Sequence, residues 1–116
     1  MPESIENGDP KGTAIVSEFA EDPDMVELIE MFVDELPARI EEIRTAFETA
    51  EQDRLATLTH QMKGAAPGYG FSTLGSAAGR IEGILRNASA DPDPESLAAS
   101  IHELISLCER VSRKAA

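Results

Sequence analysis

Apolar residues recur at helical spacing along most of the chain. Between Pro23 and about Ala50 they form one stripe when successive residues are placed about 100° apart around a helix axis. The stripe contains Met25, Leu28, Ile29, Phe32, Leu36, Ile40, Ile43 and Phe47. Pro37 lies inside it, and we expect a kink there without a break, because the stripe continues in phase beyond the proline.

Three more amphipathic helices are predicted downstream. One covers roughly Gln52 to Ala66, and the next roughly Ser72 to Asn87. A loop from Asn87 to Pro94 (NASADPDP) leads to the last, from about Pro94 to Arg113. The residues expected to face inward on the last two helices are Leu74, Ala77, Ala78, Ile81, Leu85, Leu97, Ile101, Leu104, Cys108 and Val111.

The first part of the chain follows a different pattern. Residues 1–12 are polar and aperiodic, which predicts a flexible tail. A short helix is expected from Thr13 through Ile15, Val16 and Phe19. Because helices with one apolar stripe and short connections pack best side by side, we predict an all-α fold. It is an antiparallel four-helix bundle with an additional short N-terminal helix, in one domain over residues 13–113 followed by a tail at 114–116.

Charge and composition narrow the class of partner. The net charge is -12, and such a surface repels nucleic acid and anionic lipid, so neither is expected as a partner. A protein partner with basic residues fits the charge, although solubility alone explains it equally well. With no charged-then-apolar leader and no apolar run of bilayer length, we expect a cytoplasmic protein. The single cysteine, Cys108, excludes an intramolecular disulfide and is expected to be buried.

The helix predicted from about Gln52 to Ala66 presents a histidine to solvent. Its apolar residues fall within an arc of about 100°. They are Leu55, Leu58, Met62, Ala65 and Ala66. His60 lies opposite the centre of that arc, which argues against a histidine packed in the core.

The neighbours of His60 on this helix are mostly small. Ala56, Thr57 and Gly64 leave the imidazole clear, so another protein's backbone has room to approach. Lys63 is one turn along, where its ammonium can offset the charge of about -2 that a phosphoryl group carries. By wheel geometry alone, an ordinary solvated helix face explains this cluster equally well.

The segment from His60 to Phe71 (HQMKGAAPGYGF) resembles the signature of histidine-containing phosphotransfer (HPt) domains. The match assigns the phosphoacceptor to His60, the Lys-Gly pair to Lys63 and Gly64, and further positions to Met62, Gly70, Leu74 and the Ile81-Glu82 pair. The Tyr69-Gly70-Phe71 ending is also similar to the phosphotransfer domain of chemotaxis histidine kinases, and Phe71 is expected in the core. With the helical context, the resemblance covers roughly residues 13–113.

The segment also departs from the pattern. Ala65 and Ala66 stand where many members have Ser, and both are expected to face the core. Pro67 removes a backbone donor and is expected to end or kink the helix just past His60. The glycines that follow lack the spacing and the Lys-Ser/Thr of a phosphate-binding P-loop.

The resemblance implies a phosphorelay protein. His60 would accept a phosphoryl group from a sensor or hybrid histidine kinase, or from a receiver-domain phospho-aspartate, and pass it to a response regulator. Lys63 and Gly64 complete the site, and a docking surface is expected at Ala56, Thr57, Gln61, Pro67 and Tyr69. The chain needs no cofactor of its own, because the partner receiver domain supplies Mg²⁺. We expect a monomeric phosphocarrier without autonomous kinase activity.

Other interpretations stay open at this point. One is an adaptor bundle whose histidine is never phosphorylated. Another is a phosphotransfer domain excised from a larger chemotaxis-type or hybrid histidine kinase. His102 lies off its apolar stripe and is interpreted as a surface histidine, and neither histidine has a Cys or Asp cluster beside it for a metal.

Overall fold

The computed structural model describes residues 14–87 and 93–111, and most of them are helical. Their elements are α2 (Val26–Glu48), α3 (Gln52–Ala65), the 3-10 helix η2 (Ala66–Tyr69), α4 (Ser72–Asn87) and α5 (Pro94–Glu109). No strand occurs in this described part of the chain, where an isolated bridge joins Ile15 to Val111. The prediction of an all-α protein with four main helices is confirmed, and α4 has the predicted ends.

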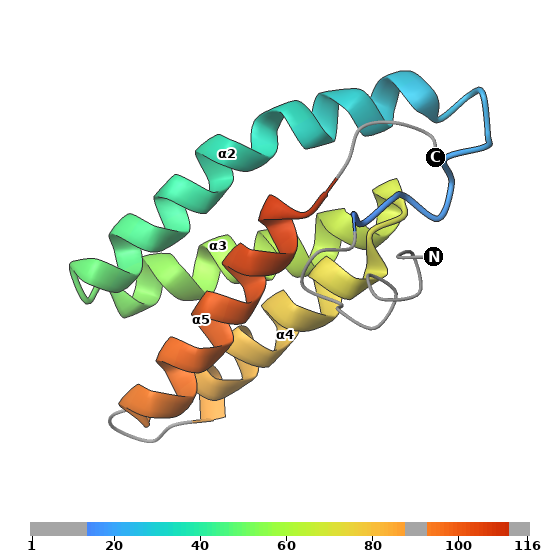
Figure 1. The fold of residues 1–116 in the computed structure, drawn as a ribbon. Coiled ribbons are helices and arrows are strands. Elements are labelled where there is room, and N and C mark those ends of the chain that lie inside the picture. Colours follow the sequence, from blue (N-terminus) through green and yellow to red (C-terminus); the bar gives the residue numbers. More distant parts are fainter. Residues whose placement is uncertain (1–13, 88–92, 112–116) are drawn as a thin grey trace, which may run out of the picture.

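The four α-helices form a bundle (Figure 1). α3 packs along α4, and α4 packs along α5. α2 lies mainly against α3, with a smaller contact to α5. Residues 49–51 form the short connection between α2 and α3.

The core lies where the apolar faces of the helices meet. Pro37 does not interrupt α2, as expected. Phe71 and Ala66 are fully buried, and Ala65 packs against the core at its edge. The buried hydrophobic residues are Ile29, Phe32, Leu36, Ile40, Ile43, Ala46, Leu55, Met62, Ala66, Phe71, Leu74, Ala77, Ala78, Ile81, Leu97, Ile101, Leu104 and Cys108.

Leu28 and Thr59 are among the positions that differ from the predicted core. Leu28, which was placed on the inward stripe of the first long helix, is 45% exposed. It lies at the edge of the stripe, in the first turn of α2. Thr59 is completely buried instead, because its hydroxyl donates to the Leu55 carbonyl (2.9 Å) and so loses no hydrogen bond on burial.

The predicted short N-terminal helix is not present among the residues described, 14–25, so this part of the fold prediction is wrong. The segment instead forms hydrogen bonds to residues that are distant in the sequence. The Ile15 amide donates to the Arg110 carbonyl (2.7 Å), and the Glu18 amide donates to the Gly70 carbonyl (2.8 Å). The Ser17 hydroxyl donates to the Tyr69 carbonyl (2.7 Å). These long-range bonds satisfy polar groups of the segment without any helix.

Pro67 ends α3 as predicted, and the chain tightens into the 3-10 helix η2. Gly70 follows with φ +89°, a left-handed conformation that favours glycine. A Cβ at Gly70 would also collide with the Ser17 hydroxyl and the Glu18 backbone. The turn after η2 therefore needs glycine both for its dihedral angle and for the close approach of the N-terminal segment.

Several predictions concern residues outside those described. The tails at 1–12 and 114–116 and residues 88–92 of the predicted loop belong there. The last helix ends at Glu109 and not near Arg113, since Arg110 is in a turn and Val111 pairs with Ile15. Within the described ranges, none of the helices combines the length and the apolar character that a bilayer crossing requires.

Candidate functional site

His60 lies in the middle of α3 and its side chain is 63% exposed, as the helical wheel predicted. Thr57 and Gln61 on the same helix are also exposed, and Ala56 is half-buried. The opposite face of α3 carries the fully buried Leu55 and Met62. The packing of α3 in the core therefore fixes the imidazole on the outside of the bundle.

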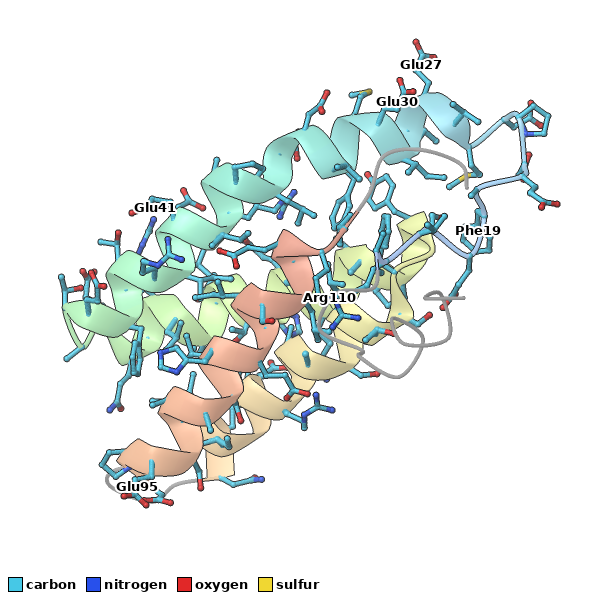
Figure 2. All side chains as sticks on the ribbon, in the orientation of Figure 1. Phe19, Glu27, Glu30, Glu41, Glu95 and Arg110 are labelled. Atoms are coloured by element: carbon cyan, nitrogen blue, oxygen red, sulfur yellow. The ribbon has the colours of Figure 1, made fainter. Side chains whose placement is uncertain are left out.

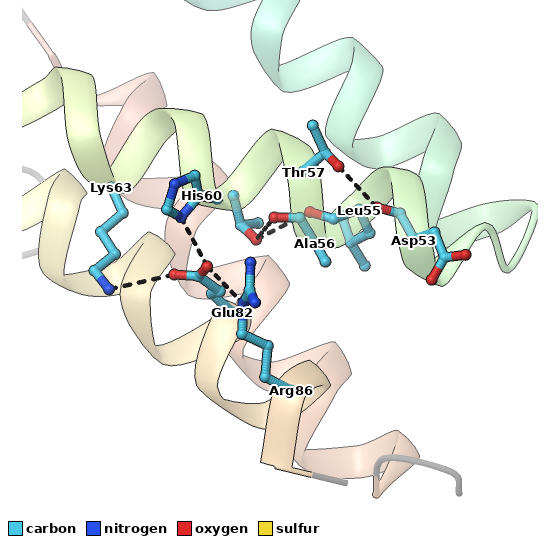
Figure 3. Close-up of polar contacts among 9 residues, drawn as sticks. Asp53, Leu55, Ala56, Thr57, His60, Lys63, Glu82 and Arg86 are labelled. Carbon is cyan, nitrogen blue, oxygen red and sulfur yellow. Dashed lines mark hydrogen bonds and ion pairs between the residues drawn. The ribbon is translucent and has the colours of Figure 1, made fainter. Parts of the chain in front are cut away.

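The imidazole has a partner on the neighbouring helix (Figure 3). His60 Nδ1 lies 2.8 Å from Oε2 of Glu82 on α4, although the two residues are 22 positions apart in the sequence. Lys63 Nζ donates to Glu82 Oε1 at 3.3 Å. Arg86 Nε donates to Glu82 Oε2 at 2.7 Å. One carboxylate thus joins a histidine, a lysine and an arginine.

Glu82 is buried, with 6% of its side chain exposed, while the three side chains that contact it are mostly exposed. Burial raises the pKa of Glu82, but the hydrogen bonds from His60, Lys63 and Arg86 outweigh burial, and the pKa lies below its ordinary value of 4.5. The carboxylate is therefore ionised at neutral pH.

This contact assigns the proton on the His60 ring. An ionised carboxylate only accepts hydrogen bonds, so Nδ1 must be the donor. In the neutral ring the proton then resides on Nδ1, and Nε2 keeps its lone pair. Because the ring is exposed, that lone pair is available to a reagent arriving from outside.

Lys63 lies beside this contact and spans from α3 to α4. Its side chain is 55% exposed, and its methylene groups run close to Gly79, where a Cβ would lie 3.5 Å from Lys63 Cδ. The sequence predicted that Lys63 would reach a group on the His60 ring. In the structure its ammonium is paired with Glu82, within reach of the histidine that shares this carboxylate.

Gly64 follows His60 by one turn of α3, and both Gly64 and Gly68, which lies on η2, are exposed. A Cβ built at either position would meet no other atom within 4 Å. The fold of this chain therefore does not require glycine there. The surface one turn beyond His60 is therefore open to solvent.

The remaining predicted docking residues, Pro67 and Tyr69, lie on η2. Pro67 is exposed and packs against Gly75, where a Cβ would lie 2.7 Å from Pro67 Cγ. The Tyr69 ring stacks on Phe32 of α2 with their centroids 4.7 Å apart. Tyr69 is half-buried and joins η2 to the core, so only part of it is available to a partner.

Sequence reasoning missed Glu82 and Arg86 as site residues. Glu82 was matched to a position of the family pattern without a role at His60. A usable signal was present, because Glu82 follows the inward Ala78 by one helical turn. A charged residue at the margin of an apolar stripe needs a partner, and Arg86 is one turn further on.

Other ionisable groups do not form a second centre. Burial, with a smaller contribution from Glu109, raises the pKa of Cys108 to about 12. His102 is exposed on α5, as predicted. In the ranges 14–87 and 93–111, no three His, Cys, Asp or Glu side chains are grouped as a metal site would need.

Comparison with known proteins matches most of the chain to one family. A family model described as "Hpt domain" matches residues 27–114, a range that includes His60, Lys63, Glu82 and Arg86. No curated protein and no solved structure gave a significant match to the chain.

Proposed function

The chain belongs to the Hpt domain family, whose members carry out histidine phosphotransfer in two-component signalling, and on that premise we propose that His60 is its phosphoacceptor. In this proposal His60 takes a phosphoryl group from a histidine kinase or from a receiver-domain phospho-aspartate and passes it to the aspartate of a response regulator. Hpt domains as a family interact with kinases and response regulators.

The observation that carries the proposal is the 2.8 Å contact between His60 Nδ1 and the buried Glu82 carboxylate. It leaves Nε2 as the nucleophile on the exposed edge of the ring. Nε2 attacks phosphorus, the N–P bond forms, and the bond from phosphorus to the donor oxygen breaks. The donor leaves as the aspartate carboxylate of a receiver, or as ADP if a kinase delivers the group from ATP.

Glu82 also stabilises the product of this step. Once Nε2 is bonded to phosphorus, the ring carries a positive charge for as long as Nδ1 keeps its proton. The ionised Glu82 carboxylate accepts the hydrogen bond from that proton and offsets the charge. Transfer to the next aspartate reverses the same bonds, and the Nδ1 proton does not need to move.

Lys63 is the group that we propose binds the phosphoryl oxygens. Its ammonium already lies next to the carboxylate that His60 contacts, and its side chain is exposed enough to turn toward Nε2. The partner receiver domain would supply Mg²⁺ and most of the transition-state stabilisation. The chain then acts as a phosphocarrier without kinase activity of its own.

Further parts of the proposal concern assembly. We infer that the four helices run antiparallel, which the short connection at residues 49–51 favours. The partner would dock on the open surface beside Gly64, with Ala56, Thr57, Gln61 and the exposed Pro67 around it. A monomeric state stays a prediction.

Transfer of radiolabelled phosphate tests the proposal. The protein is incubated with an active histidine kinase or a phosphorylated receiver, beside His60→Gln and His102→Gln, in which the other exposed histidine is replaced. We expect acid-labile, base-stable label on the wild type and on His102→Gln and none on His60→Gln. Equal labelling of all three proteins, or none with any cognate partner, would leave the adaptor interpretation in its place.

A further inference from the structure

Arg86 contacts the same carboxylate oxygen as the histidine. Its Nε lies 2.7 Å from Glu82 Oε2, and His60 Nδ1 lies 2.8 Å from that oxygen. Arg86 follows Glu82 by one turn in the last turn of α4, a position where positive charge also interacts favourably with the helix dipole. Nothing in the function proposed above uses this residue.

The two cations at Glu82 are placed differently. Lys63 binds Oε1 at 3.3 Å, whereas Arg86 binds Oε2 at 2.7 Å, and in Figure 3 they approach the carboxylate from different sides. The shorter contact belongs to Arg86, and it is made within one helix, so it does not depend on how α3 and α4 pack. The lysine contact is longer and crosses between helices.

The pair of Arg86 and Glu82 differs from an ordinary ion pair on a helix surface. Glu35, which pairs with Arg39 at the same i,i+4 spacing, is 58% exposed, whereas Glu82 is 6% exposed. A buried carboxylate is stable only while it is well paired. If Lys63 leaves Glu82 to bind a phosphoryl group, the carboxylate needs another cation to remain ionised and in place.

Building on the proposed function, we propose that Arg86 is a positioning residue, which holds Glu82 against His60 Nδ1 and thereby allows Lys63 to leave for the phosphoryl oxygens. The role of Arg86 is to fix the carboxylate; it does not touch the reacting atoms. Without Arg86, Lys63 would be the remaining side-chain ammonium or guanidinium at Glu82. The carboxylate would then be held less firmly against Nδ1, and the Nδ1-protonated form of the His60 ring would be favoured less.

The protonation of the His60 ring gives a readout that needs no phosphotransfer. Nitrogen-15 NMR distinguishes the protonated from the unprotonated ring nitrogen. It would be measured across the pH titration of the wild type, Arg86→Gln, Arg86→Lys and Arg80→Gln. Arg80 is the matched control, because it lies on α4 and forms an exposed ion pair with Glu103 (2.9 Å) that is not part of the site.

We expect the wild type and Arg80→Gln to keep the proton on Nδ1 in the neutral ring. Arg86→Gln should show a mixture of the two neutral forms, and Arg86→Lys should recover much of the wild-type pattern. With phosphoramidate as a small phosphoryl donor, Arg86→Gln should be phosphorylated about tenfold more slowly, because a less firmly held Glu82 carboxylate stabilises less of the positive charge that the ring gains as the N–P bond forms.

The proposal is overturned if Arg86→Gln keeps both the wild-type ring signals and the wild-type rate, or if Arg80→Gln changes as much as Arg86→Gln. Its failure is separable from failure of the proposed function. Unchanged ring signals in Arg86→Gln together with normal labelling of His60 would remove the role of Arg86 alone. A wild type that is never labelled by a kinase or receiver would remove the function.

Discussion

The chemistry of His60 depends on which of its ring nitrogens carries the proton, and a residue from another helix decides this. Glu82 accepts from Nδ1, and its ionisation is maintained by hydrogen bonds that outweigh its burial. The same balance makes Glu82 a source of pH-dependent stability. Because its pKa is lower in the folded than in the unfolded chain, Glu82 stabilises the fold above its ordinary pKa of 4.5.

Replacement of Glu82 by Gln should remove this pH-dependent contribution to the free energy of unfolding. The stabilisation is present at neutral pH and is lost as the pH falls through the folded-state pKa, so the wild type should lose stability on acidification more steeply than Glu82→Gln. Urea unfolding at a series of pH values from neutral to below 4.5 measures the difference. Parallel pH profiles for the two proteins would show that Glu82 titrates normally.

Lys63→Met should separate the charge of Lys63 from its packing. Methionine keeps an unbranched apolar side chain over Gly79 but removes the ammonium at Glu82. We expect phosphorylation of His60 to slow about tenfold, the value of one charge-assisted hydrogen bond, with an unchanged fold. Rates come from phosphoramidate labelling and the fold from circular dichroism. Loss of helical structure in Lys63→Met would instead mean that Lys63 has a structural role.

Helical periodicity predicted the elements that local sequence determines. α4 begins and ends where its stripe and flanking residues indicated. α3 ends at Ala65, two residues before Pro67, because proline has no amide hydrogen to continue the α-helix. The segment before α2 was predicted wrongly as a helix, because its bonds go to Arg110, Tyr69 and Gly70, which no local pattern reveals. Tertiary contacts decided its conformation.

Replacement by alanine should change the stability of the fold in opposite directions at Gly64 and at Gly70. Gly64 lies inside α3 with open space around it, so Gly64→Ala should stabilise the fold by about 1 kcal/mol through helix propensity. Gly70→Ala should destabilise it by at least about 1 kcal/mol, since φ is +89° and a Cβ meets Ser17. Chemical denaturation measures both changes.

Gly64→Ala carries a second expectation. Its methyl group lies beside His60 on the surface where we place the partner, so transfer from a phosphorylated receiver should slow even though the protein is more stable. Labelling by phosphoramidate, which is small, should be affected less. If receiver and phosphoramidate reactions change equally, the partner does not approach over Gly64.

On the scale of the whole molecule, the site exists only because α3 and α4 pack together. His60 and Lys63 were found from the sequence because they share one helix, whereas Glu82 and Arg86 contribute from α4, at least 19 residues beyond Lys63. A helical wheel describes one helix at a time and cannot pair residues across two.

The acidic character of the surface is visible in Figure 2, where Glu27, Glu30 and Glu41 project from the outer side of α2.

Cys108 reports on the integrity of this bundle. It is 5% exposed on α5, and its pKa is about 12, so the native thiol should react very slowly with a thiol reagent at pH 8. Its reaction rate should therefore follow unfolding of the bundle and increase with urea in parallel with loss of circular dichroism. Fast labelling of the native protein would mean that α5 detaches while the other helices remain folded.

The central claim is that His60 receives the phosphoryl group on Nε2 while Glu82 holds the proton on Nδ1. Nitrogen-15 and phosphorus-31 NMR of the phosphorylated, histidine-labelled protein tests it most directly, because the coupling to phosphorus identifies the nitrogen that is bonded. We predict phosphorus on Nε2 of His60 and a proton retained on Nδ1. Phosphorus on Nδ1, or a phosphohistidine at His102 in place of His60, would contradict the account.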